Sequence, residues 1–262
     1  MELKFPSREL NSVLNKLTEN FKKLSSGKRI NSAKDDAAGL AILNALESDV
    51  KVLDQGTRNT RDAQSAIAIA EGATGQISSL LTRQSELAEQ AANGSLSDEQ
   101  RGSLQAEFEQ LGQEIDRIAN TTEFNGKKLL NGDGFSVQVG ADGSSSSSLQ
   151  VDGVQINSVQ SLSIGSIDDA KAALDQIKTE IGDLSSKRAN LGSASSRLDA
   201  AAANNSERSI NERDAASRIG DVDVAEETAA LVANKIRAQT GPAIQGQANN
   251  LNANLVQKLL GI

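Results

Sequence analysis

Four aspartates are the residues that could most readily do chemistry, because they lie close together in two pairs. Asp35 and Asp36 are adjacent in "NSAKDDAAGL", and Asp221 and Asp223 are one residue apart in "RIGDVDVAEE". Paired carboxylates can bind Ca²⁺ or act as general acid and base. Neither segment has the alternating ligands, central glycine and terminal Glu of an EF-hand loop. We therefore favour a structural role for these aspartates, in helix caps and charged connectors.

The chain lacks the residue types that most catalytic and metal sites use. Its 262 residues include no Cys and no His. This excludes a thiol nucleophile and a thiolate metal site, and it removes the commonest general base and transition-metal ligand. The glycine pairs are not followed by the Lys-Ser/Thr of a phosphate-binding loop. We expect no catalytic site, metal site or cofactor, so an enzyme is improbable.

Composition excludes further classes of protein. The formal net charge of −8 argues against nucleic-acid binding, which normally needs a clustered basic face. No apolar run approaches the ~20 residues of a membrane span. The opening "MELKFPSREL" lacks the basic-then-apolar layout of a cleaved signal peptide. Trp and Tyr are absent, so the interior must consist mainly of Leu, Ile, Val and Ala, which favours closely packed helices.

Apolar residues recur every three or four positions near the N-terminus and at intervals of one or two helical turns near the C-terminus, which is the pattern of a coiled-coil seam. The N-terminal seam is predicted to comprise Leu10, Leu14, Leu17, Phe21 and Leu24. The C-terminal seam is predicted to comprise Val232, Ile236, Ile244, Leu251, Leu255 and Leu259. Pro242 interrupts the second segment and predicts a bend, because an interior proline removes a helical hydrogen bond.

A break in the helical pattern follows the first seam and predicts a connector. Ser32 is expected to cap the next helix, with Asp35 three residues later as in a capping box. "RIGDVDVAEE" is predicted to be a second connector, placed like a mirror image of the first. The residues expected to form the first connector are Gly27, Arg29, Ser32, Asp35 and Asp36.

The pattern predicts a mainly α fold with long helices and one small β-hairpin region. "NG" dipeptides and short alternating runs place the strands near the middle of the chain, with "GADGSSSSS" as an exposed loop. The expected divisions are 1–42, a terminal helix and connector; 43–120, long helices; 121–165, the β-hairpin and turn region with an exposed tip; 166–220, a return helix; and 221–262, a second terminal helix.

Each terminal helix alone is expected to be only marginally stable in water. They can pair with each other, since the chain leaves and returns at the same end. A pair of amphipathic helices would still expose much apolar surface, so the pattern predicts self-assembly.

Several long segments resemble bacterial flagellin, the subunit of the flagellar filament. They are "LSSGKRINSAKDDAAGLAI", "ELAEQAANGSLS", "EIDRIANTTEFNGKKLLNG" and "SRIGDVDVAEETAALVANKIRAQTGPAIQGQANN". The resemblance implies an inner coiled-coil domain formed by both termini and an outer core of bundled helices with a small β-hairpin region. Only about 40 residues stand where flagellins usually carry variable domains, so the chain resembles a short, core-only form.

The resemblance also implies function and partners. The expected role is a structural subunit that assembles with copies of itself into an extracellular filament for swimming motility. Export would proceed through the flagellar type III apparatus without a cleaved signal peptide. An export chaperone and the cap and junction proteins would be partners. The terminal arms, roughly residues 1–31 and 228–262, are expected to fold as they assemble.

Two kinds of surface site follow from the same resemblance. Arg83, Leu87 and Glu107 match positions through which an animal Toll-like receptor recognises flagellins; the alternative is that they serve only subunit packing. The serine run could accept O-linked glycans, although a plain flexible loop is the preferred interpretation. The serines concerned are Ser144, Ser145, Ser146, Ser147 and Ser148.

Two other functions remain as alternatives. A hook–filament junction protein of the flagellum has similar terminal domains, and a cytosolic coiled-coil scaffold would form discrete oligomers without secretion. The nearly complete "SSGKRINSAKDDAAGLAI" and the "QAN" near the end favour flagellin. The chain departs from the family pattern at its opening, which lacks "INTN", and at Pro242.

Overall fold

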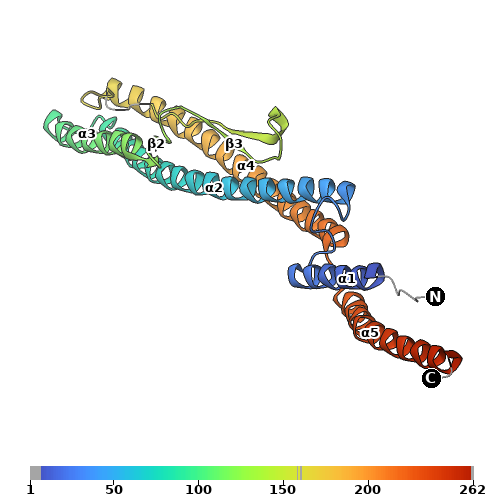
Figure 1. Ribbon diagram of the computed structural model, residues 1–262. Coiled ribbons are helices and arrows are strands. Elements are labelled where there is room, and N and C mark those ends of the chain that lie inside the picture. Colours follow the sequence, from blue (N-terminus) through green and yellow to red (C-terminus); the bar gives the residue numbers. More distant parts are fainter. Residues whose placement is uncertain (1–6, 158, 160, 261–262) are drawn as a thin grey trace. The chain divides into compact units, whose positions relative to one another are not determined.

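Five long helices make up most of the computed structural model, in which the backbone is described for residues 7–157, 159 and 161–260 (Figure 1). The helices are α1 (Ser7–Ser26), α2 (Ala37–Ala91), α3 (Asp98–Thr121), α4 (Ile167–Gly220) and α5 (Val224–Leu260). Short strands and a single 3-10 turn lie between α3 and α4. The predicted mainly α fold with one small β region is confirmed.

The contacts divide the chain into two compact units. The terminal unit comprises Met1–Val50 together with Ile210–Ile262, and the central unit comprises Lys51–Ser209. Both ends of the chain therefore belong to the same unit, as expected from the two terminal seams. Helices α2 and α4 each contribute to both units.

Aliphatic side chains from three helices form the core of the central unit. Phe108 is the aromatic residue in it, and its ring is almost fully buried. Helices α2, α3 and α4 contribute the large buried side chains Ile67, Ile77, Leu81, Ile115, Ile177, Leu184 and Leu198, and the region between α3 and α4 adds Leu129, Leu130, Leu149 and Ile164. A core of this kind is thin, because Leu and Ile allow helices to pack closely.

Three polar side chains interrupt the buried face of α2, and each has a hydrogen bond. The Thr60 hydroxyl donates to the Gly56 carbonyl at 2.6 Å, and the Thr74 hydroxyl donates to the Glu71 carbonyl at 3.0 Å. The Gln84 amide instead crosses to α3 and donates to the Phe108 carbonyl at 3.0 Å. The threonines are thus satisfied within their own helix, whereas Gln84 ties two helices together.

Two antiparallel hairpins form the β region. Strands β1 (Glu123–Phe124) and β2 (Lys127–Lys128) flank a tight turn whose central residues, Asn125 and Gly126, have φ of 49° and 77°. Such left-handed values are those of the "NG" turn that the sequence predicts. Strand β3 (Phe135–Gln138) pairs with β4 (Ser148–Val151), with Phe135 opposite Val151.

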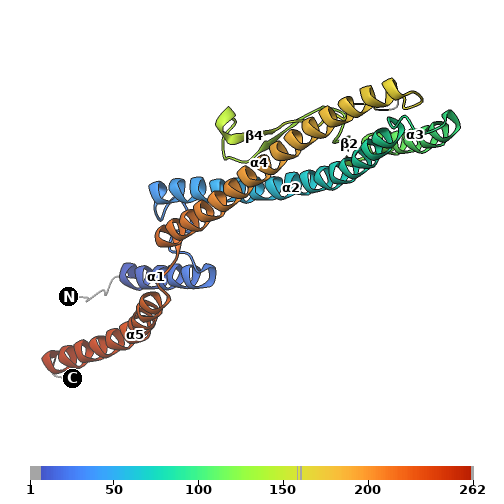
Figure 2. The ribbon, with the colours of Figure 1, turned by 180° about the vertical axis from the view of Figure 1, so that it is seen from behind.

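The β3–β4 hairpin lies along the helices of the central unit (Figures 1 and 2). The Asn59 amide of α2 donates to the Gln138 carbonyl at 3.0 Å, and the Asn205 amide of α4 donates to the Val139 carbonyl at 2.6 Å. Gly56 of α2 lies against the backbone of Val139. The expected exposed tip is therefore reduced to the loop between the two strands, because both helices hold the hairpin.

Serine side chains cap two of the long helices. Ser97 and Gln100 form a capping box at the start of α3, and the Ser166 hydroxyl accepts a hydrogen bond from the Asp169 amide at the start of α4. Ser32 is not the cap of α2, contrary to the prediction. The carboxylate of Asp36 caps that helix by accepting from the Gly39 amide at 2.8 Å, and α2 begins one residue after Asp36.

The close contact at Gly56 predicts opposite effects of the same substitution at two helix positions. In Gly56→Ala the new methyl group would meet the Val139 carbonyl oxygen, so we expect a loss of about 1–2 kcal/mol in the free energy of unfolding. In Gly72→Ala it would meet open space, so alanine's better helix propensity should stabilise the protein by up to ~1 kcal/mol.

Urea unfolding followed by circular dichroism would measure both changes. Equal effects of the two substitutions would contradict the assignment of Gly56 to a close helix–hairpin contact.

Candidate assembly interface

Helices α1 and α5 pack against each other within the terminal unit. The less exposed positions of α1 repeat at helical spacing, and so do those of the first half of α5. On α1 they are Val13, Leu17, Asn20 and Leu24, and on α5 they are Glu227, Leu231, Asn234 and Ala238. The expectation that the two terminal helices pair with each other is therefore met by the structure, through a narrow stripe on each helix.

The centre of this contact is polar. Asn20 and Asn234 are only 7% and 8% exposed, and the Asn234 amide donates to the Asn20 side-chain oxygen at 3.0 Å. The Asn20 amide in turn donates to the Glu227 carboxylate. Sequence analysis missed these residues because it followed the apolar positions alone. A usable signal was present, since Asn20 lies three residues after Leu17 and four before Leu24.

The predicted N-terminal seam points only partly into this contact. Leu17 and Leu24 are half-buried, whereas Leu10, Leu14 and Phe21 are exposed, Phe21 by 60%. Leu14 and Phe21 each follow a less exposed residue by one position, which turns them about 100° away around the helix. The result is an apolar stripe on α1 that α5 leaves uncovered.

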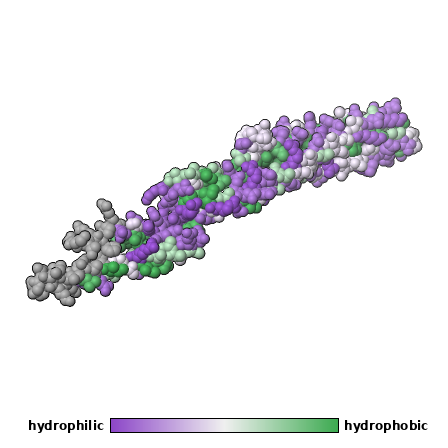
Figure 3. Space-filling model, turned by 90° about the vertical axis from the view of Figure 1, so that its right-hand side faces the viewer, coloured by the Kyte–Doolittle hydropathy of each residue, from purple (hydrophilic) through white to green (hydrophobic). Residues whose placement is uncertain are grey.

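The predicted C-terminal seam is exposed wherever its side chains are described. Val232 and Ile236 lie two residues to either side of Asn234, which places them on the opposite side of α5, and Ile236 is 54% exposed. Ile244 and Leu251 are also exposed. The side chains of Leu255 and Leu259 lie outside the described residues. Figure 3 shows patches of apolar surface on the terminal unit.

Helix α5 continues through Pro242, and its ribbon bends along its length (Figures 1 and 2). A proline inside a helix lacks the amide needed for the hydrogen bond to the preceding turn. A bend at Pro242 in particular stays a prediction, because the helix curves along much of its length.

The two predicted connectors lie side by side. The Arg29 amide donates to the Gly220 carbonyl at 2.6 Å, and the Val222 amide donates to the Gly27 carbonyl at 3.0 Å. Gly27 has a φ of 70°, a left-handed value that favours glycine. The Arg29 guanidinium also donates to the Ile219 carbonyl at 2.5 Å. These backbone bonds join the end of α1 to the start of α5.

The four aspartates singled out at the start organise backbone in and near these connectors. The Asp35 carboxylate accepts from the amides of Asn31 and Ser32, and the first of these bonds contributes most to holding its pKa below the ordinary value. Asp36 caps α2, and Asp223 caps α5 by accepting from the Ala225 amide at 2.9 Å.

The fourth, Asp221, accepts from the Ser217 hydroxyl at 2.7 Å. All four side chains thus have structural partners.

The three residues matched to receptor recognition are not equally accessible. The Arg83 guanidinium donates to the Glu107 carboxylate at 2.8 and 3.0 Å, which links α2 to α3 on the surface. The hydrogen bond from Arg83 to Glu86 raises the pKa of Arg83 most, and the bonds to Glu107 raise it further. Leu87 is 1% exposed and belongs to the core, because it lies on the inner face of α2. The structure therefore leaves Arg83 and Glu107 as the exposed members of the set.

The serine run is similarly divided. Ser144, Ser145 and Ser146 are exposed and Ser148 is half-buried, whereas Ser147 is buried and its hydroxyl donates to the Asp142 carboxylate. Ser145–Ser147 form a 3-10 turn rather than an extended loop. Ser147 is thus poorly placed to accept a glycan, because its hydroxyl faces the protein.

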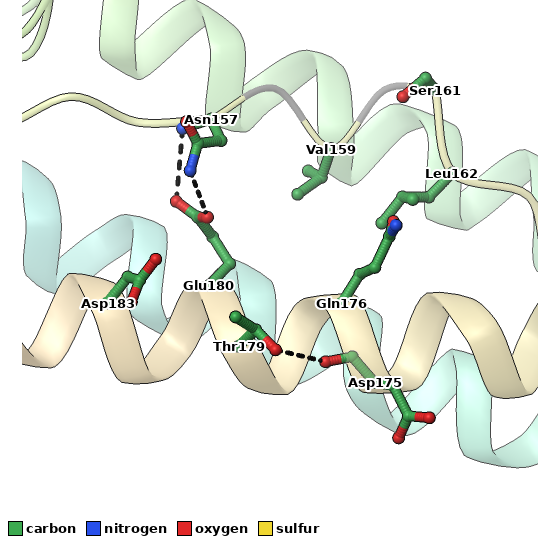
Figure 4. Close-up of a pocket in the computed structure, with 9 residues that line it drawn as sticks. All are labelled: Asn157, Val159, Ser161, Leu162, Asp175, Gln176, Thr179, Glu180 and Asp183. Carbon is green, nitrogen blue, oxygen red and sulfur yellow. Dashed lines mark hydrogen bonds between the residues drawn. The ribbon is translucent and has the colours of Figure 1, made fainter.

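A polar pocket of about 380 Å³ lies between α4 and the segment before it (Figure 4). The Asn157 amide donates to the Glu180 carboxylate at 2.8 Å across it, and the Thr179 hydroxyl donates to the Asp175 carbonyl at 2.9 Å. The first of these bonds fastens the segment to α4, whereas the second lies within α4. Within the described part of the chain, no cluster of three acidic side chains is arranged to hold a metal ion.

Comparison with known proteins identifies the family. The bacterial flagellin N-terminal helical region matches residues 6–134, and the bacterial flagellin C-terminal helical region matches residues 164–259. A flagellin of Halalkalibacterium halodurans is 37% identical over 258 residues, covering 96% of this chain and 95% of its own. A flagellin of Bacillus subtilis is 34% identical over 279 residues, covering 92% of each chain.

Solved structures agree. Bacillus cereus flagellin is similar with a TM-score of 0.51 and 31% identity, covering 56% of this chain and 88% of its own. A putative flagellar hook-associated protein from Vibrio parahaemolyticus has a TM-score of 0.61 over 71% of this chain and all of its own, but at 16% identity it shows the fold alone.

Among the described helices, none has a stretch long and apolar enough to cross a membrane. Both family regions match in order, and full-length relatives align over nearly the whole chain. The chain therefore belongs to the bacterial flagellin family, whose members are structural subunits of the flagellar filament and not enzymes.

Proposed function

We propose that the uncovered apolar stripes of α1 and α5 are the surfaces that neighbouring subunits cover as the filament grows. The observation that carries this proposal is the exposure of Leu14, Phe21, Val232 and Ile236 on helices that already pair with each other. An apolar area of this kind on a soluble chain usually marks an interaction site. Contacts between different surfaces of identical subunits build a filament when the rotation that relates neighbouring subunits does not close into a ring.

Coverage of these stripes would also complete the folding of the terminal helices. Helix α1 has 20 residues, none of them Ala, and the stability of such a helix comes mainly from the packing of its apolar face. Its partner covers one narrow stripe with a polar centre, which adds little hydrophobic stabilisation. Burial of each exposed Leu, Ile or Phe in the filament would contribute about 1.5–3 kcal/mol. Folding of the arms is therefore coupled to polymerisation in this proposal.

The remaining partners follow from the same exposed surface. Before assembly an export chaperone would cover the C-terminal stripe, because exposed apolar side chains favour aggregation. The chain would pass through the flagellar export channel without a cleaved signal peptide, and cap and junction proteins would meet the two ends of the filament. The absence of Cys leaves no disulfide to form before or during export.

Two surface sites of the central unit belong to the proposal as well. Arg83 and Glu107 form an exposed pair on which an animal Toll-like receptor could bind the free subunit. Ser144, Ser145 and Ser146 are the serines that an O-linked glycan could reach.

Polar substitution of the α1 stripe should weaken polymerisation without unfolding the central unit. In Leu14→Ser with Phe21→Ser, the lost burial of about 1.5–3 kcal/mol per side chain should raise the critical concentration for filament growth by at least about tenfold. Asn15→Ser, on an exposed position of the same helix, is the matched control and should leave it unchanged. Sedimentation after salting-out measures the critical concentration; an unaltered value in the double variant would contradict the proposal.

Removal of either arm should abolish polymerisation. Chains lacking residues 1–31 or 228–262 lose one member of the α1–α5 pair, whereas the core of the central unit stays complete. We expect no filaments by electron microscopy and a helical circular-dichroism spectrum from the remainder. Filaments grown from either truncated chain would rule out the assigned role of the arms.

The receptor proposal has its own test on the soluble monomer. Arg83→Ala with Glu107→Ala should reduce its affinity for the ectodomain of the flagellin-sensing Toll-like receptor at least tenfold. Arg117→Ala with Glu114→Ala removes another exposed ion pair, on α3, and should leave binding intact. Surface plasmon resonance would measure both; equal affinities of the two variants would end this part of the proposal.

A further inference from the structure

The buried polar centre of the α1–α5 contact needs an explanation, because apolar side chains would stabilise it more simply. Asn20 lies on the same stripe as Leu17 and Leu24, where leucine would extend the seam. Buried amides cost free energy unless they are hydrogen-bonded. In coiled coils, a buried asparagine can give up stability in return for a single register and a single choice of partner.

We propose that Asn20, Glu227 and Asn234 fix the register in which α1 pairs with α5 of its own chain. The three side chains form a continuous relay in which Asn234 donates to Asn20 and Asn20 donates to Glu227. The Lys23 ammonium lies 3.8 Å from the second carboxylate oxygen of Glu227 and adds a charge of opposite sign. Each of the two amide groups thus donates one hydrogen bond in this arrangement.

The relay is specific to one register. Asn20 contacts residues seven apart on α5, Glu227 and Asn234, so it lies level with the turn between them. A slip of one heptad would move α1 by about 10 Å along α5 and separate Asn20 from one of its two partners. The polar group that loses its partner would then be buried without a hydrogen bond. The free-energy cost of that burial opposes the slip.

Hydrogen bonds that fix one register are useful because the two helices also carry exposed apolar stripes. Leu14, Phe21, Val232 and Ile236 are apolar and available, and apolar seams of similar spacing can pair in several registers. A seam of leucines throughout would let the arm of one chain pair wrongly with itself or with another copy. This inference rests on the proposed role of the arms in assembly, and it adds the residues that make their pairing selective.

Cysteine cross-linking can measure the register directly, because the natural chain contains no Cys. Helices α1 and α5 are antiparallel, so Val13, seven residues before Asn20, lies level with Ala238. Val13→Cys with Ala238→Cys should therefore form an intramolecular disulfide. Leu231→Cys or Gln245→Cys, one heptad to either side of Ala238, should not bond to Cys at position 13, because the extra distance of about 10 Å exceeds the reach of a disulfide.

The same pairs are then placed in Asn20→Leu with Asn234→Leu. We expect slipped disulfides and intermolecular dimers to rise from a few per cent to at least a third of all disulfides, read by non-reducing gels and peptide mass spectrometry. The matched control, Asn15→Leu with Asn250→Leu, adds the same apolar groups at exposed positions and should keep the single register. Disulfides are identified in both the pelleted polymer and the supernatant. The register can therefore be determined even for a variant that fails to polymerise.

Exchanging the carboxylate and the amide between positions 20 and 227 tests whether these two side chains contact each other directly. Asn20→Asp places a second carboxylate beside Glu227 and should reduce the position 13–238 disulfide at least threefold. Adding Glu227→Gln restores one donor and one acceptor and should recover its yield. A single register in the leucine variant, or no recovery in the exchanged pair, would overturn the inference. Failure of the natural chain to polymerise would instead count against the proposed function.

Discussion

The central feature of the structure is that each terminal helix buries one stripe against the other helix and leaves a second, apolar stripe exposed. Helix α1 offers α5 a narrow stripe with Asn20 at its centre and leaves Leu14 and Phe21 uncovered. Helix α5 likewise turns Asn234 inward and Val232 and Ile236 outward. A pair built this way is held in place by hydrogen bonds but stabilised only weakly by burial. Most of its hydrophobic free energy is therefore still available to a neighbouring subunit.

The connectors and the central unit are held by contacts that the α1–α5 pair does not have, namely backbone hydrogen bonds and an aliphatic core. Backbone hydrogen bonds from Arg29 to Gly220 and from Val222 to Gly27 fix where α1 ends and α5 begins. The central unit has its own aliphatic core around Phe108 and a hairpin anchored to α2 and α4. The central unit thus has a core of its own, whereas the terminal unit exposes the apolar side chains that we propose neighbouring subunits cover.

Sequence pattern predicted the helices well because their signals are local. The Ser97 capping box, the "NG" hairpin turn and the spacing of the seams each depend on residues within one or two turns. Ser32 failed as a cap because Asp36 competes for the same helix start. The partners of Asn20 could not be predicted, because Glu227 and Asn234 lie more than 200 positions away, although its spacing from Leu17 and Leu24 placed it on the inner stripe. Apolar spacing identified both seams but not which stripe each helix gives to its own chain.

Hydrogen–deuterium exchange, compared between dilute monomer and assembled filament, tests the central claim most directly. We expect amides of α1 and α5 to exchange quickly in the monomer and to become at least a hundredfold slower in the filament. Amides in the core helices of the central unit should be protected in both states. Full protection of α1 and α5 in the dilute monomer, with no further slowing on assembly, would contradict the account.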